Sequence, residues 1–142
     1  MIEFQLSGTP IAWKRAKPLY NQRRMIDEQV KEKQQIRWQL RSQFHSSPLT
    51  VPLEVQLIFF MPISAYISGV KKRAMIGGVI HHIKKPDVDN MIKFYFDAMT
   101  GVIYVDDAQI WCESAKKVYA ERPGVHIRII PSSLNQVIGQ EE

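Results

Sequence analysis

The amino-acid sequence predicts a single α+β domain in which a mixed four-stranded sheet is combined with two main helices. Four segments either alternate apolar and polar residues, with the period of a β-strand, or are apolar on both faces. Two other segments place apolar residues three or four positions apart, as amphipathic helices do. The elements follow one another as strand, helix, strand, helix, strand, strand, and this order favours one α+β domain over residues 1–142.

Three of these elements lie in the first half of the chain. Residues 1–6 are expected to form a half-buried strand, because every second residue is apolar. A loop rich in Lys and Arg follows, and residues 27–45 are expected to form a helix of good helix formers whose apolar positions recur every fourth residue. Residues 53–61 are apolar on both faces, so we expect a central strand that is covered on both sides.

The second half begins with a long segment, 62–86, that shows no clear periodicity and contains no acidic residue. Loops of this length are usually functional or mobile. A second helix is expected over 90–99, where a broad apolar face is available, and it is followed by two strands, from about 109 to 120 and from 125 to 130. The tail, from about residue 132 to 142, is expected to be loosely ordered.

The composition indicates a globular protein with an anionic partner. Hydrophobic residues make up 45% of the chain, and 19 Lys and Arg against 14 Asp and Glu give a net charge of +5. The positive charge is concentrated in residues 14–41 and 71–85. The single cysteine, Cys112, excludes an internal disulfide framework. No apolar run approaches the ~18 residues of a membrane span, so we expect no membrane association.

Two short acidic motifs are the candidates for chemistry. In the first, Asp87 and Asp89 are two residues apart, so both carboxylates point to one side if the backbone is extended. Lys93 follows Asp89 by four residues, on the same face of the predicted helix. The second motif is Asp106-Asp107, directly before a predicted strand. If three of these carboxylates converge, their repulsion requires protons, cations or a metal ion, and oxygen ligands favour Mg²⁺ or Mn²⁺.

The same residues also have purely structural interpretations. Asp89 is suited to cap a helix that starts at Asn90, and a carboxylate just before it gains from the helix dipole. The adjacent pair of aspartates is also ordinary turn chemistry. Asp97 is better explained as an ion-pair partner on the helix surface than as a ligand. The adjacent histidines, His81 and His82, lie in a basic, Gly-rich segment and are better explained as solvated side chains.

The combined spacing of these motifs is more specific than either aspartate pair. The sequence reads P-D-V-D-N over 86–90, then Lys93, then F-D-A-M over 96–99 and Y-V-D-D-A-Q-I over 104–110. This pattern resembles the RusA family of Holliday junction resolvases, whose core reads D-L-D-N-x-x-K-x-x-x-D-A-L followed by D-D-x-Q-[IV]. The strong match covers about 25 residues. The loop at 10–15 resembles that of prophage-type members, whereas Pro86 stands where some members have Arg.

The resemblance implies a RusA-like fold and a homodimeric, Mg²⁺-dependent endonuclease that resolves four-way DNA junctions by paired, symmetric nicks. Carried over by position, Asp87, Asp89 and Asp107 would be the catalytic metal ligands, with Mg²⁺ replaceable by Mn²⁺, and Lys93 would be the important lysine. Asn90 and Asp106 would have supporting roles. The resemblance also implies a cytoplasmic, nucleoid-associated protein of bacterial or phage origin.

Affinity for DNA is expected to come from the basic segments, because each neutralised phosphate releases counterions. The aromatic residues Trp13, Tyr20 and Tyr66 suit either stacking on exposed bases or internal packing. The residues expected to contact DNA are Lys14, Arg15, Lys17, Lys71, Lys72, Arg73, Lys84, Lys85 and Lys116.

Three other functions remain open at this stage. A structure-selective nuclease that acts on flaps or forks would use the same metal chemistry. A non-catalytic DNA-architectural protein of the same fold would have no reason to keep repulsive carboxylates together. A basic RNA-binding factor would explain the charge and leave the acidic motifs unexplained. Cleavage of a panel of labelled DNAs with Mg²⁺ and with EDTA separates these functions.

Overall fold

The fold was analysed in a computed structural model, which describes residues 1–15, 17–18, 25–26 and 28–132. The elements in this part of the chain are β1 (Ile2–Ser7), β2 (Lys17–Pro18), β3 (Met25–Ile26), α1 (Val30–Gln43), β4 (Leu53–Met61), α2 (Gly69–Ile76), α3 (Val88–Met99), the 3₁₀ turn η1 (Asp107–Gln109), β5 (Ile110–Tyr119) and β6 (Gly124–Pro131). The C-terminal segment from about residue 132 to 142, which was expected to be loosely ordered, lies almost entirely outside the described residues. None of the described helices has the length and apolar character needed to cross a membrane.

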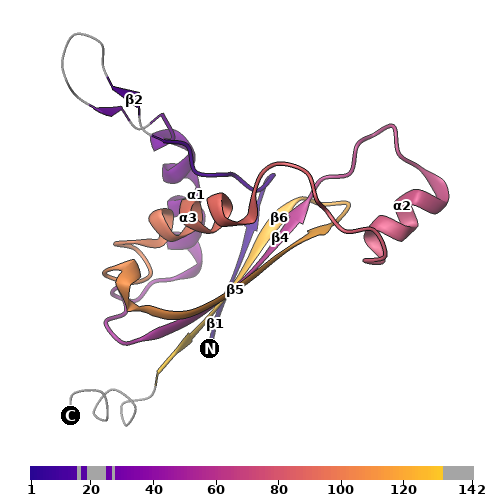
Figure 1. The fold of residues 1–142 in the computed structure, drawn as a ribbon. Helices are drawn as coiled ribbons and strands as arrows, with labels where there is room; N and C mark the ends of the chain where they lie inside the picture. The colour runs from indigo at the N-terminus through magenta and orange to yellow at the C-terminus, as the bar shows by residue number, and fades with distance from the viewer. Residues whose placement is uncertain (16, 19–24, 27, 133–142) are drawn as a thin grey trace.

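The four long strands form one mixed sheet in the order β1-β6-β4-β5, as Figure 1 shows. The β1–β6 and β4–β6 pairs are antiparallel, whereas β4 and β5 are parallel. The pair is parallel because the chain leaves β4 at one end of the sheet, passes through α2 and α3, and returns to the end at which β4 begins, where β5 starts. The predicted α+β class and mixed four-stranded sheet are therefore confirmed.

The helices α1 and α3 lie on the same face of this sheet (Figure 1). Alternate residues of β4, β6 and β1 point toward them, as the strand period requires, and all of these are buried except the half-buried Ile2 and Pro131 at the strand ends. Helix α3 is the most apolar of the three, and six of its twelve residues are buried. At its C-terminal end, Arg37 of α1 donates hydrogen bonds to the carbonyl oxygens of Asp97 and Ala98. The helices are thus fixed to each other and to the sheet, which makes α3 a rigid platform.

The structure corrects three expectations. The expected cover on both sides of β4 is wrong for the described residues, because no helix packs on the face that carries Ile58 and Phe60, and both residues are half-buried. The unpatterned segment contains the helix α2, which stands beyond the end of the sheet with only Met75 buried. Two short strands, β2 and β3, pair in the basic loop where no strand was expected.

Candidate metal and DNA-binding site at the start of α3

Helix α3 begins at Val88, and Asp87 is its N-cap residue, with an extended backbone (φ −73°, ψ 143°). The side chain of Asp87 makes no capping hydrogen bond, although its position would allow one. Its Oδ2 atom instead lies 3.1 Å from the Nζ atom of Lys85, in a solvent-exposed ion pair. The alternative in which Asp89 caps a helix that starts at Asn90 is wrong, because Asp89 lies within the first turn. Both carboxylates are therefore exposed at the positive end of the helix dipole.

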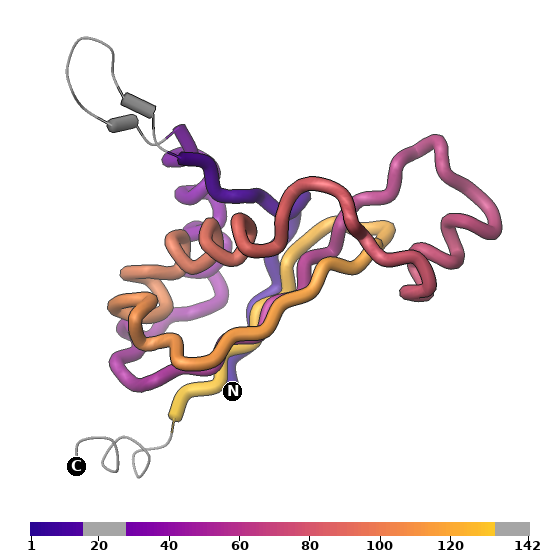
Figure 2. Tube along the Cα trace, in the orientation of Figure 1, coloured from indigo at the N-terminus to yellow at the C-terminus, as the bar shows by residue number. Residues whose placement is uncertain are grey.

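Lys93 lies one turn further along α3, and its ammonium is held by an aromatic ring. The Nζ atom is 3.6 Å from the centroid of the Trp13 ring, which is cation–π geometry. The backbone N–H of Trp13 donates to the carbonyl oxygen of Asn90 (2.8 Å), and the N–H of Ile11 donates to the hydroxyl of Tyr95 (3.2 Å). Burial raises the pKa of Tyr95 to about 12, which keeps that hydroxyl neutral. The strap formed by residues 11–15 is thereby tied to the start of α3, along which it runs in Figure 2.

The backbone just before Asp87 lies against β5. The ammonium of Lys117 donates to the carbonyl oxygens of Lys84 (2.8 Å) and Pro86 (3.0 Å). Two residues further along β5, the ring of Tyr119 contacts the ring of His82 at a centroid distance of 5.0 Å. Burial and the nearby charge of Lys117 lower the pKa of His82, so this histidine is neutral at pH 7 and partly buried rather than solvated as expected.

The second acidic motif lies at the opposite end of α3. After α3 the chain turns at Gly101 (φ 84°), and the hydroxyl of Tyr104 donates to the carbonyl oxygen of Phe96, which brings η1 back to the C-terminal end of the helix. Asp106 caps η1, and the hydrogen bond from the Ala108 N–H lowers its pKa. The turn interpretation is therefore correct for Asp106.

The side chain of Asp107 takes no part in the cap of η1, which Asp106 and Gln109 form. Asp107 is exposed, but slight desolvation of its carboxyl, together with the hydrogen bond and negative charge of Asp106, raises its pKa. Asp97 also contributes to this rise, which indicates that it lies nearby. Asp97 forms an ion pair with Lys33 of α1 (3.9 Å) rather than with Lys93, so its expected role as an ion-pair partner is confirmed with a different lysine.

The two acidic motifs do not meet within one chain. The twelve residues of α3 separate them, which corresponds to about 18 Å at 1.5 Å per residue. Among the described residues, no group of three or more His, Cys, Asp or Glu side chains could hold a metal ion. A single chain thus offers Asp87 and Asp89 at one end of the helix and Asp107 at the other. The assignment of all three to one ion stays a prediction.

The basic residues expected to contact DNA fall into separate groups. Lys14 and Arg15 are exposed and follow Trp13, which is tied to the start of α3, and Lys84 and Lys85 are exposed just before Pro86 and Asp87, so all four belong to segments that meet at the start of α3. The side chain of Lys17 lies outside the described part of the structure.

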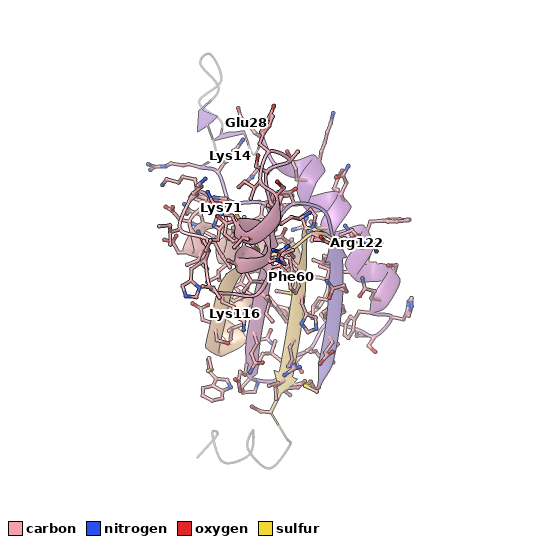
Figure 3. All side chains as sticks on the ribbon, turned by 90° about the vertical axis from the view of Figure 1, so that its right-hand side faces the viewer. Lys14, Glu28, Phe60, Lys71, Lys116 and Arg122 are labelled. Atoms are coloured by element: carbon pink, nitrogen blue, oxygen red, sulfur yellow. The ribbon has the colours of Figure 1, made fainter. Side chains whose placement is uncertain are left out.

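The remaining candidates lie on other elements. Figure 3 labels Lys71, which projects from α2, and Lys116, which projects from β5. Within α2, Lys71 and Arg73 are exposed, and Lys72 forms an ion pair with Glu121 (3.4 Å). Lys116 is exposed on the sheet face that lacks helices, where it lines a hollow of about 400 Å³ with His126 and Arg128. Glu3 pairs with both of these residues, so this hollow is less basic than its lysine suggests.

Sequence reasoning missed the roles of two residues. Gln109, part of the D-D-x-Q motif, is structural: its Nε2 donates to the carbonyl oxygens of Leu49 and Val51, and its Oε1 accepts from the N–H groups of Val105 and Asp106. A capping box, with a Gln three residues after an Asp, is a sequence signal that could have found it. The sequence gives only a weak indication that Lys117 points inward. Lys116 and Lys117 are adjacent in a strand, so one of them must face the side of the sheet that carries the helices.

Comparison with known proteins identifies the family of the chain. The family model described as endodeoxyribonuclease RusA matches residues 8–130, which is most of the chain and includes both acidic motifs. The chain belongs to this family. It is also 37% identical over 79 residues to an uncharacterised protein, YqaN, of Bacillus subtilis (strain 168). That match spans 56% of each of the two chains, so the chain covers little more than half the length of this relative.

Proposed function

We propose that this protein is a divalent-metal-dependent endodeoxyribonuclease that nicks branched DNA, with four-way junctions as its substrate, and that it acts as a homodimer. The observation that carries the proposal is the exposed pair of carboxylates at the start of α3. Asp87 makes no capping bond there, and it is flanked by four exposed basic residues and by Lys93. Membership of the family described as endodeoxyribonuclease RusA supports an endonuclease activity.

The donor set at the start of α3 fits Mg²⁺ or Mn²⁺. Such ions are usually held by one or two carboxylates, water and substrate phosphates, and Asp87 and Asp89 supply two carboxylates next to a basic surface. The ion would supply Lewis acidity and a water of lowered pKa. Lys93 would hold positive charge at the phosphate, and Trp13 restricts where that ammonium can lie. Lys85 pairs with Asp87 in this structure, and it would be available to a phosphate if a cation replaced it at the carboxylate.

A second copy of the chain would give Asp107 a place in the same site. β5 is an edge strand, and in the described structure it pairs with β4 on one side only. Antiparallel pairing of two β5 edges about a two-fold axis would set the start of one β5 beside the end of the other. Asp107 lies just before the start of β5, and Lys117 near its end holds the backbone that leads to Asp87.

This arrangement makes each site composite, with Asp87 and Asp89 from one copy and Asp107 from the other. It also yields two equivalent sites related by a two-fold axis, which suits a junction that must be cut on two opposed strands.

The test is cleavage of labelled four-way junction, flap, fork, duplex and single-stranded DNA, each with Mg²⁺ and with EDTA. The proposal predicts paired nicks in the four-way junction that require Mg²⁺ and disappear in Asp87→Asn, while binding to the junction is retained. If flaps or forks are cleaved in preference to the four-way junction, the protein is a structure-selective nuclease of those substrates and not a junction resolvase. Metal-independent cleavage, or none on any substrate, would overturn the proposal.

A further inference from the structure

The adjacent residues Lys116 and Lys117 of β5 face opposite sides of the sheet and do different things. In the strand register, Lys117 pairs with Phe59, a buried residue on the face that carries α1 and α3. Lys116 pairs with Ile58 on the open face and is exposed. A lysine that serves only as a solvated charge would project into water, as Lys116 does. Lys117 is half-buried and extends toward the segment that precedes α3.

The ammonium of Lys117 makes two hydrogen bonds to backbone carbonyl oxygens, those of Lys84 and Pro86. Two of the three donors of an ammonium group are thereby used on one short stretch of chain. In the described structure, residues 81–86 make no backbone–backbone hydrogen bond outside regular elements, so these side-chain bonds are what fixes their backbone. The ring contact between His82 and Tyr119 fastens the same segment to the same strand.

The residue that follows this fastened segment is Asp87. Its position relative to Asp89 depends on where the chain enters α3, and the carbonyl oxygen of Pro86 lies at that entry. A carboxylate pair binds a cation well only when both groups are held at the right separation, because ordering them on binding costs conformational free energy. The backbone anchor therefore acts on the ligand geometry and not only on the loop.

We propose that Lys117 is a positioning residue of the metal site: by holding the carbonyl oxygens of Lys84 and Pro86, it fixes Asp87 in its place beside Asp89. Lys117 touches neither DNA nor the cation in this role. The inference rests on the proposed function, since it assumes that Asp87 and Asp89 hold the metal. It also separates Lys117 from the DNA-contacting lysines, because its ammonium is directed at the protein's own backbone.

The experiment is calorimetric titration of Mn²⁺ into the DNA-free, full-length protein, compared among the wild type, Lys117→Met and Lys117→Arg. Removal of a group that orients metal ligands typically weakens binding about 10- to 100-fold, and we expect Lys117→Met to lie in that range. Lys117→Arg keeps donors that can reach both carbonyl oxygens and should restore most of the affinity. Arg122→Met, which removes an exposed charge from the turn after β5, is the matched control and should bind Mn²⁺ like the wild type.

Junction binding in EDTA is the second measurement. The inference predicts that Lys117→Met binds the junction within about twofold of the wild type, because the lost ammonium contacts no phosphate. Unchanged Mn²⁺ affinity in Lys117→Met would overturn the inference, and so would a loss of junction affinity with Mn²⁺ affinity intact. If the wild type itself neither binds Mn²⁺ nor cleaves with Mg²⁺, the proposed function fails instead.

If Lys117→Met does not fold, as judged by circular dichroism, a second pair of variants decides. Lys117→Gln has too short a side chain to reach both carbonyl oxygens, whereas Lys117→Arg reaches them. Weaker Mn²⁺ binding by the Gln variant than by the Arg variant supports the positioning role. Equal affinities for the two variants overturn it.

Discussion

At the N-terminal end of α3, Asp87 and Asp89 are exposed, and Asp87 makes no bond that stabilises the helix. At the C-terminal end, Asp106 caps η1 and Asp97 pairs with Lys33, which leaves Asp107 with a raised pKa. Both ends are acidic, with two aspartates at the first and three at the second, but their contacts differ. Asp106 and Asp97 hold η1 and α1 in place, whereas Asp87 makes only an exposed ion pair with Lys85, and Asp89 accepts only from the N–H of the next residue, Asn90. Carboxylates that the fold does not use are the better candidates for chemistry, and the following predictions test that distinction.

The largest loss of cleavage is expected for Asp87, at the N-terminal end of α3. Asp87→Asn keeps the shape of the side chain but removes a charged ligand. Loss of a residue that only orients a metal ligand costs up to about 100-fold in activity, so loss of the ligand itself should lower Mg²⁺-dependent cleavage by at least that factor. Junction affinity should stay equal or rise, because a negative charge near the phosphates is lost. Cleavage and gel-shift assays on the same preparation measure both. Wild-type cleavage by this variant would remove Asp87 from the site.

The two adjacent aspartates should separate into a functional and a structural residue. Asp107→Asn should lose cleavage to a similar extent, about 100-fold or more. It should melt at the same temperature as the wild type or slightly higher, since a raised pKa means that the folded state disfavours its ionised form at neutral pH. Asp106→Ala removes the cap of η1 and should melt at a lower temperature while it retains cleavage. The reverse assignment of the two variants would contradict this comparison.

Trp13 should show an intermediate effect through Lys93. Trp13→Leu removes the ring face that holds the ammonium, and a cation–π contact of about 0.5 to 1 kcal/mol corresponds to a roughly two- to fivefold lower rate constant for cleavage. Trp13→Phe keeps a ring and should lie closer to the wild type. Single-turnover cleavage at saturating enzyme gives this number, and equal rates for the two variants would indicate that Trp13 only packs.

The smallest effects are expected for single basic residues. Lys14→Ala should lower the slope of log affinity against log salt by about 0.9 in magnitude if Lys14 contacts one phosphate of duplex DNA. Lys116→Ala tests the open sheet face in the same way. A change in slope for Lys116 alone would move the DNA path away from the start of α3.

The four long strands and the two long helices could be predicted because their apolar residues repeat with the period of a strand or a helix, whereas the two-residue strands β2 and β3 are too short to show a period. Helix α2 could not, because Val70 and Ile76 are exposed and a single buried residue, Met75, leaves no periodic signal. The apolar second face of β4 misled the prediction, since Ile58 and Phe60 remain half-buried without a covering layer in the described structure.

The candidate site could be predicted only in part. The residues at the start of α3 are close in sequence, so one helix turn fixes their neighbourhood. The position of Asp107 depends on how the chain returns after Gly101, where the contact from Tyr104 to Phe96 leads it back to the far end of α3. Trp13 and Lys117 contact residues more than 30 positions away in the sequence, and no local sequence pattern predicts such contacts.

The most direct test of the composite site uses mixed dimers. Asp87→Asn and Asp107→Asn chains, each inactive as homodimers, are co-expressed with different affinity tags and purified as heterodimers. If each site combines Asp87 of one copy with Asp107 of the other, one of the two sites is intact, and the heterodimer nicks junctions at about half the wild-type rate without pairing the cuts. A matched heterodimer of Asp87→Asn with Asp89→Asn has no intact site and stays inactive. The account would be contradicted if the heterodimer of Asp87→Asn with Asp107→Asn were as inactive as the two homodimers.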